Sequence, residues 1–276
     1  MPFETLYNKE KEEYLIQNKQ IRYIPSGKAL VRLYKYAKNR VPRKKNVMVF
    51  ANPNFDSNET ALYHESIAPI RGTNENIVKP FFKKIYEPLL GTKLEAEAIN
   101  KMMDNVEVFE WNRANETNLL KVEEPKILHI ATHGFFINAP NIPNPMLKSG
   151  IILSGANKSA RKHQGYGRVT ALKLSGLNLK STDLVVLSAC DTGVVDINNT
   201  DSISGLGKAF IQAGAKDVVM SLWSVDDNAT KELMVSFYEQ IKEKPNYALA
   251  LKEAKLKMID ENMHPFYWGG FVMLGL

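Results

Sequence analysis

Residues 183–193 read DLVVLSACDTG, an apolar run that ends in a cysteine followed by Asp, Thr and Gly. Four consecutive apolar residues predict a strand that is buried on both faces, as in a parallel sheet. We expect this strand to cover residues 183–189 and to stop at Cys190, because Asp-Thr-Gly favours a turn. A second apolar run, KILHIAT (126–132), stops in the same way at His133. In an open parallel sheet, ligands bind beyond the carboxyl ends of the strands, so this edge is where we expect the function.

Short apolar runs alternate with amphipathic stretches on both sides of these two strands. The alternation predicts parallel strands joined by helices, and right-handed crossovers place helices on both faces of the sheet. The expected fold is therefore α/β with a mainly parallel central sheet. We expect poor patterning at 54–92, a proline-marked loop at 138–148 and a mobile surface loop at 156–168. The expected strands cover 46–53, 106–111, 126–132, 149–155, 183–189, 216–223 and 266–275, and the expected helices cover 94–103, 202–214, 227–243 and 246–262.

Length and composition fit one α/β domain over residues 1–276. The chain has 276 residues, 44% of them hydrophobic, which is enough to bury a full core. It has one cysteine, so it forms no internal disulfide, and its five histidines lack the spacing of a zinc site. We therefore expect no metal. There is no apolar run of about 18 residues and no signal peptide, so we expect a soluble cytoplasmic protein without a membrane partner.

Positive charge gathers at the N-terminus. The net charge is +6, yet residues 1–45 alone hold 12 Lys and Arg against 4 Asp and Glu. We interpret residues 1–45 as a basic segment leading into the core, and its stretch KNRVPRKK (38–45) as a solvated face. No spaced aromatic platform for bases follows, so we do not expect nucleic acid to bind directly. Gly205-Leu206-Gly207 follows no strand directly, so it does not predict a nucleotide-binding loop.

Cys190 and His133 have the residue types that a thiol peptidase needs. A free thiol with a pKa of about 8.5 is only a few per cent thiolate at neutral pH, so a neighbouring imidazole must take its proton. We expect the backbone N–H groups of Gly134 and Cys190 to bind the oxyanion. Spacing alone leaves other readings open, because a lone cysteine is often a small core residue. His129 competes for the role of His133, but it lies within an apolar run and is expected to be a satisfied core residue.

Several blocks of the chain resemble the CHAT domain, a caspase-like peptidase domain related to separase and often attached to TPR repeats in bacteria. The resemblance covers nearly the whole chain in order. Its strongest blocks are HIATHGFF (129–136), LVVLSACDTG (184–193), GLGKAFIQAGAKDVVMSLWSVDD (205–227) and HPFYWGGFVMLG (264–275). The resemblance implies a caspase-like αβα sandwich and a cysteine endopeptidase without a cofactor. The family's catalytic dyad falls on His133 and Cys190, both intact here.

The resemblance also implies a substrate pocket. Relatives such as separase prefer Arg or Lys before the scissile bond and use an acidic pocket, for which Asp191, Asp226 and Asp227 are the candidates. Asp227 resembles the separase pocket aspartate best, although Asp227 is also placed to cap its helix and Asp191 to form a turn. Trp223, at the end of the SLW segment (221–223), is expected to pack against an extended peptide.

Two functions are open at this stage. One is an endopeptidase that acts on protein or peptide substrates and is regulated by a partner or signal. The other is a CHAT fold retained as a scaffold with negligible turnover. Family members usually begin with a further strand, so we expect either a short stand-alone form or a sheet edge that is completed by another segment or by a partner, such as a TPR-containing protein.

Overall fold

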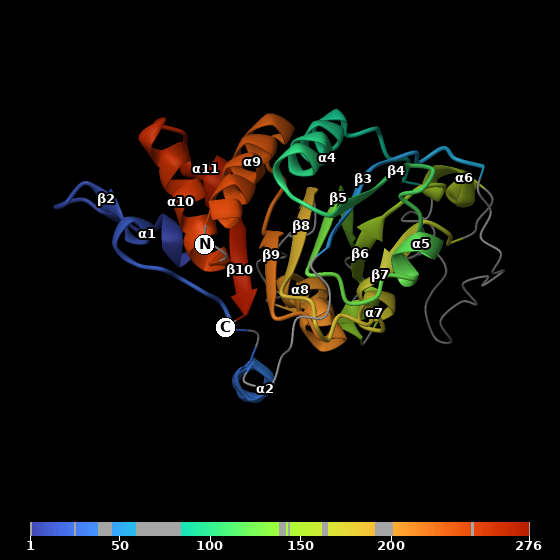
Figure 1. The fold of residues 1–276 in the computed structure, drawn as a ribbon, viewed down its shortest axis with the longest axis horizontal. Helices are drawn as coiled ribbons and strands as arrows, with labels where there is room; N and C mark the ends of the chain where they lie inside the picture. Colours follow the sequence, from blue (N-terminus) through green and yellow to red (C-terminus); the bar gives the residue numbers. More distant parts are fainter. Residues whose placement is uncertain are drawn as a thin grey trace.

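A computed structural model describes residues 2–24, 26–37, 46–58, 84–137, 142, 144–161, 165–190, 201–243 and 246–275. Its main sheet has the strand order β10-β9-β8-β5-β3-β4, and neighbours are parallel except β10, which is antiparallel to β9 (Figure 1). The strands are β3 (Val47–Pro53), β4 (Val106–Trp111), β5 (Ile127–Phe136), β8 (Leu184–Cys190), β9 (Asp217–Ser221) and β10 (Phe271–Gly275). The mainly parallel α/β fold predicted from the sequence is therefore confirmed.

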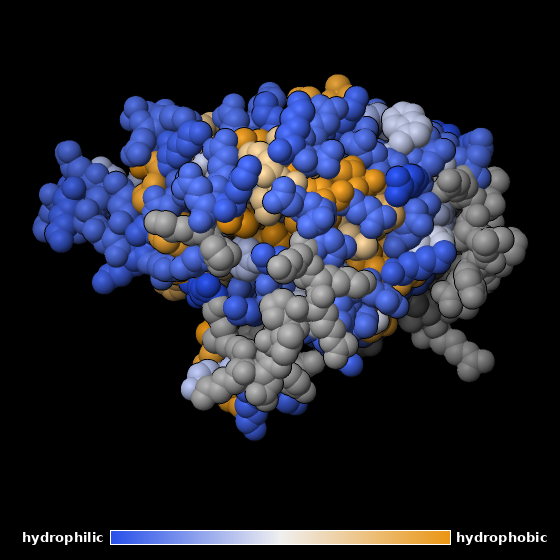
Figure 2. Space-filling model, viewed as in Figure 1, coloured by the Kyte–Doolittle hydropathy of each residue, from blue (hydrophilic) through white to orange (hydrophobic). Residues whose placement is uncertain are grey.

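Helices cover both faces of the sheet, because the strand residues are apolar on both faces. In β8, Leu184 and Val186 belong to one buried cluster, whereas Val185 and Leu187 belong to the other. The first cluster packs against α4 (Leu90–Met102), α9 (Asp227–Glu243) and α10 (Tyr247–Asp260). The second packs against α5 (Glu116–Leu120), α7 (Ala171–Leu174) and α8 (Asp201–Ala213), and Figure 1 shows the two layers on opposite sides of the sheet. Hydrophilic residues cover most of the described surface in Figure 2.

The N-terminal segment packs against the β10 side of the sheet. It contains η1 (Phe3–Thr5), β1 (Tyr7–Asn8), β2 (Glu13–Tyr14) and α1 (Leu15–Asn18), and it is followed by α2 (Gly27–Ala37), whose described side chains are exposed. Tyr23 pairs with Leu274 of β10 through a parallel bridge, so this segment occupies part of the sheet edge. Two buried partners anchor it: the Glu4 carboxylate lies 3.5 Å from Nζ of Lys255, and Nη1 of Arg22 lies 3.0 Å from Oδ1 of Asp217.

The mobile loop expected at 156–168 is wrong for residues 156–161 and 168, and residues 162–164 of that stretch lie outside the described residues. Ala156–Arg161 form a helix, α6, and most of its residues are buried. Arg168–Thr170 form β7, which pairs with β6 (Ser149–Ile152), and β6 pairs in turn with the last residues of β5. The segment is polar because its polar side chains are used for internal hydrogen bonds. Of the other elements, α11 (Pro265–Trp268) replaces the first residues of the strand expected at 266–275, and η2 (Pro145–Leu147) lies within the expected loop 138–148.

The described residues contain neither a membrane-spanning helix nor a cluster of metal ligands. None of the helices in that part of the chain has the length and apolar character needed to span a membrane. Within the same residues, no group of three or more His, Cys, Asp or Glu side chains is arranged to hold a metal ion.

Candidate active site

The ends of β5 and β8 bring the two predicted reactive positions together. The strands are parallel neighbours in continuous register from Ile127–Leu184 to His133–Cys190. Paired residues in adjacent strands lie about 5 Å apart, so the backbones of His133 and Cys190 are direct neighbours. Cys190 is the last residue of β8, whereas β5 continues past His133 to Phe136. Asp191 lies outside the described residues.

The His133 imidazole is held on three sides. Its Nε2 lies 2.7 Å from the backbone carbonyl oxygen of Glu87. The rings of Phe55 and Tyr86 each lie with their centroids 5.3 Å from that of the imidazole. A carbonyl oxygen only accepts hydrogen bonds, so Nε2 must carry a proton. In the neutral imidazole, Nδ1 is then the basic nitrogen.

Asp226 and Asp227 have different roles at the start of α9. Oδ1 of Asp226 accepts hydrogen bonds from the backbone N–H groups of Asn228 and Ala229, at 2.9 and 3.1 Å. Asp226 is therefore the helix cap, and the expectation that Asp227 caps the helix is wrong. Asp227 is the first residue of α9, and its carboxyl group is not used by the cap.

Asp227 lies close to the imidazole and to the first turn of α4. A Cβ at Gly91 would lie 3.0 Å from Cβ of Asp227, so glycine permits this close approach. Burial raises the pKa of Asp227 above its ordinary value, the Asp226 carboxylate raises it further, and His133 lowers it. A positive charge beside Asp227 would therefore stabilise its carboxylate.

Gly134 and Trp223 are placed on either side of the Cys190 position. Gly134 is buried and pairs with Ile151 of β6, directly after His133 in β5. Trp223 lies just beyond the carboxyl end of β9, the strand next to β8. Its indole N–H donates to the Phe266 carbonyl at 2.9 Å, and its ring stacks on the Phe266 ring with centroids 6.1 Å apart. The two rings form an aromatic surface at the carboxyl edge of the sheet.

A buried polar network surrounds His129, which lies four residues before His133 in β5. His129 is fully buried, as predicted, with its Nδ1 3.1 Å from the Tyr238 hydroxyl and its Nε2 3.1 Å from Oε1 of Glu95. Ser188 donates to the other carboxylate oxygen of Glu95 at 2.9 Å. The Nε2–Oε1 pair is in close contact but does not meet hydrogen-bond geometry. Glu95 of α4 thus links β5 to β8 directly behind the candidate site.

Sequence reasoning missed Phe55, Tyr86, Glu87 and Glu95. Glu87 acts through its backbone, which leaves no side-chain signal. Tyr86 and Phe55 both lie within the stretch 54–92, in which the apolar residues have no helical or strand period. Glu95 lies on a correctly predicted helix, and a buried acid on its apolar face was an available signal.

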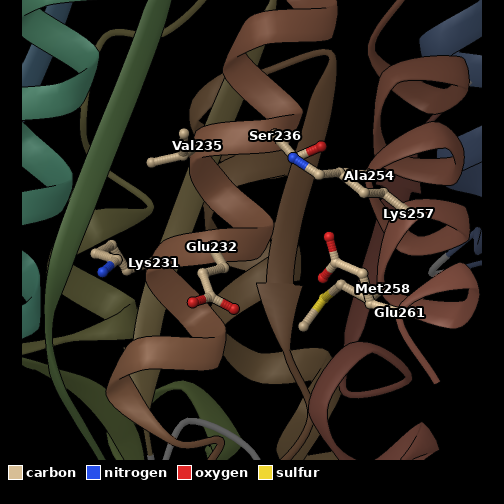
Figure 3. A pocket seen from close by; sticks show the side chains of 8 residues that line it. All are labelled: Lys231, Glu232, Val235, Ser236, Ala254, Lys257, Met258 and Glu261. Carbon is tan, nitrogen blue, oxygen red and sulfur yellow. The ribbon is translucent and has the colours of Figure 1, made fainter. Parts of the chain in front are cut away.

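A separate groove lies between the outer helices α9 and α10, away from these residues. It has a volume of about 330 Å³, and none of the predicted site residues lines it (Figure 3). Its lining mixes two lysines and two glutamates with four other side chains, so neither an apolar nor a single-charge ligand is indicated. The lining residues are Lys231, Glu232, Val235, Ser236, Ala254, Lys257, Met258 and Glu261.

Comparison with known proteins places this arrangement in a class. Among solved structures, the chain resembles separase in the Saccharomyces cerevisiae separase–securin complex, with a TM-score of 0.51, 15% identity, and coverage of 97% of this chain and 14% of that one. At that identity the likeness shows the fold alone, and that fold is the caspase-like fold of separase. The family model of the CHAT domain matches residues 1–276. The chain therefore belongs to the CHAT domain family.

Two curated relatives are tetratricopeptide repeat proteins. The chain is 33% identical to tetratricopeptide repeat protein 28 of Mus musculus over 110 residues, which is 39% of this chain. It is 35% identical to tetratricopeptide repeat protein 28 of Homo sapiens over 78 residues, which is 27% of this chain. The aligned regions span only 4% and 3% of those proteins.

Proposed function

We propose that the protein is a cysteine endopeptidase with Cys190 as nucleophile and His133 as general acid and base. The observation that carries the proposal is the register pair His133–Cys190 at the carboxyl ends of two neighbouring parallel strands. The hydrogen bond from His133 Nε2 to the Glu87 carbonyl supports it, because this bond leaves Nδ1 as the nitrogen that takes the thiol proton. No metal or organic cofactor is required.

The reaction proceeds in two halves. The thiol gives its proton to His133, and the Cys190 thiolate attacks the scissile carbonyl carbon. The oxyanion of the tetrahedral intermediate accepts hydrogen bonds from the backbone N–H groups of Gly134 and Cys190. Collapse of the intermediate breaks the C–N bond, and the leaving amine takes the proton from the imidazolium. Water, deprotonated by His133, then hydrolyses the thioester and restores the thiol.

We assign the preference for a basic residue before the scissile bond to Asp227. Its partial burial disfavours the charged carboxylate, and a substrate Arg or Lys would relieve that cost. Asp226 contributes less in this proposal, because its carboxylate caps α9. Asp191 follows Cys190 directly and is a second candidate for the pocket. Trp223 provides an aromatic surface for an extended peptide and no hydrogen bond, since its N–H already binds Phe266.

We further propose that residues 1–276 act as one domain, that the protein works in the cytoplasm, and that a TPR-containing or other regulatory protein controls it. The tetratricopeptide repeat relatives support a protein partner of this kind.

An activity probe with Arg or Lys before a thiol-reactive warhead tests the proposal. Because Cys190 is the only cysteine, every labelled molecule reports on this residue. We expect labelling of the wild type, and loss of labelling in Cys190→Ala and in His133→Ala. The test includes peptides with Arg, Lys, Leu and Asp before the scissile bond, with and without lysate proteins. If no probe or peptide reacts under any of these conditions, the proposal is contradicted and the catalytically silent scaffold is favoured.

A further inference from the structure

The segment that orients His133 has no secondary structure of its own. Residues 84–87 are neither helix nor strand, yet they supply the Tyr86 ring and the Glu87 carbonyl that contact the imidazole. Tyr86 is buried, with 3% of its surface exposed. An irregular segment keeps a defined position only where other groups satisfy its backbone. The contacts that hold this segment therefore decide where the Glu87 carbonyl lies.

Asn157 of α6 holds the segment by a two-point contact with the backbone of Tyr86. The Tyr86 N–H donates to Oδ1 of Asn157 at 2.8 Å, and Nδ2 of Asn157 donates to the Tyr86 carbonyl at 3.0 Å. Nδ2 also donates to a carboxylate oxygen of Asp56 at 3.2 Å. Asn157 is fully buried, and the oxygen and nitrogen of its side-chain amide bind the Tyr86 backbone and the Asp56 carboxylate. The contact fixes both the position and the direction of the Tyr86 peptide groups.

Arg168 of β7 holds the start of the same segment. Its Nη2 donates to the Lys84 carbonyl at 3.0 Å, and its Nη1 donates to the Ala156 carbonyl at 2.6 Å. The guanidinium carbon lies 5.6 Å from the centroid of the Tyr86 ring. Arg168 is 2% exposed, so these contacts are made without competition from water. The segment is thus fixed by side chains at two successive points before the Glu87 carbonyl.

We propose that Asn157 is a positioning residue for His133, which keeps the Glu87 carbonyl opposite Nε2 and so selects the Nε2–H tautomer. The tautomer matters because it decides which ring nitrogen accepts the thiol proton. The catalytic meaning of this inference rests on the proposed function, whereas the tautomer itself is a property of the folded protein. The two are therefore tested by separate readouts.

Nuclear magnetic resonance of the ring nitrogens measures the tautomer directly. The chain has five histidines, so long-range 1H–15N spectra of a ring-labelled sample remain simple, and His133→Gln assigns the His133 signals. In the wild type, at a pH where the ring 15N shifts show a neutral imidazole, we expect the Nε2–H form of His133 to dominate. In Asn157→Ala we expect the ratio of Nε2–H to Nδ1–H to fall by about tenfold, which corresponds to roughly 1.4 kcal/mol.

A matched control separates positioning from stability. Asn246→Ala removes the hydrogen bond that caps α10, from Leu249 N–H to the Asn246 side chain, and lies far along the chain from the segment. We expect it to destabilise the fold while the His133 tautomer ratio stays as in the wild type. Asn157→Ser provides a milder variant in case Asn157→Ala does not fold.

The outcomes are distinct. An unchanged tautomer ratio in folded Asn157→Ala or Asn157→Ser overturns the proposal. A wild-type His133 in the Nδ1–H form overturns it without any variant. A shift in the tautomer ratio without peptide cleavage by the wild type supports the positioning role and counts against the endopeptidase.

Discussion

Removing the Ser188 hydroxyl tests how much its hydrogen bond to Glu95 stabilises the strands that carry the candidate site. Ser188 lies two residues before Cys190 in β8, and its hydroxyl donates to Glu95 of α4 at 2.9 Å. Glu95 also lies 3.1 Å from His129, which is four residues before His133 in β5. The hydroxyl therefore takes part in a buried polar link that joins both β5 and β8 to α4.

The expected cost of Ser188→Ala follows from burial and charge. Ser188 is 3% exposed and Glu95 is 1% exposed, so water does not replace the lost donor. A hydrogen bond to a charged group contributes about 1.5–3 kcal/mol, and the change removes one oxygen without leaving a sizeable cavity. We therefore expect the free energy of unfolding to fall by about 2 kcal/mol.

Urea unfolding, followed by circular dichroism, measures this change. Ser236→Ala is the control, because Ser236 on α9 is 4% exposed, much like Ser188, but lines the groove between α9 and α10 away from the candidate site. We expect the control to change the free energy of unfolding by less than about 0.5 kcal/mol. The Glu95 link is refuted if Ser188→Ala is as mild as the control. A double-mutant cycle with Glu95→Gln adds a second check, with an expected coupling of about 1 kcal/mol or more.

Two further predictions concern carboxyl groups. Asp227→Ala should lower kcat/KM for peptides with Arg or Lys before the scissile bond by at least about tenfold, corresponding to roughly 1.4 kcal/mol, with little effect on other peptides. Asp226→Ala should instead reduce stability by about 1 kcal/mol through loss of the cap and leave the preference unchanged. Equal effects of the two variants on substrate preference would remove Asp227 from the pocket. For Asp217, burial raises the pKa from the ordinary 3.8 to about 6, although Arg22 opposes this shift. The folded protein therefore binds this proton more tightly than the unfolded chain, and the free energy of unfolding falls as pH rises from about 4 to about 6, by up to about 3 kcal/mol. Urea titrations across this range should show a flatter pH dependence for Asp217→Asn, and an unchanged dependence would contradict the assignment.

The elements with strong apolar periodicity were predicted well from the sequence. Helix α9 begins and ends at the expected residues, 227 and 243, because its apolar stripe and polar face leave one arrangement against the sheet. β8 has the expected position and ends at Cys190, because its apolar run is buried on both faces. The pairing of His133 with Cys190 requires β5 and β8 to be neighbouring strands, and the sequence only suggested that they are.

The environment of the imidazole was not predictable in the same way. Helix α6 lacks an apolar period because Asn157 faces the backbone of residue 86, which lies 71 positions earlier in the chain. The Glu87 contact uses a carbonyl that every residue type possesses. The cap of α9 was assigned one residue late, because Asp226 and Asp227 are chemically identical and the helix boundary is uncertain by a residue or two from sequence.

The alkylation rate of Cys190 as a function of pH tests the central claim most directly. The chain has one cysteine, so the reaction of iodoacetamide with the protein reports on this thiol alone. If the two residues form a dyad, the wild type should react near pH 6.5 at least about tenfold faster than a free thiol, whose pKa is about 8.5, and His133→Ala should lose this advantage. The dyad is contradicted if the wild type and His133→Ala follow the same pH profile, or if the thiol of the folded protein does not react at all.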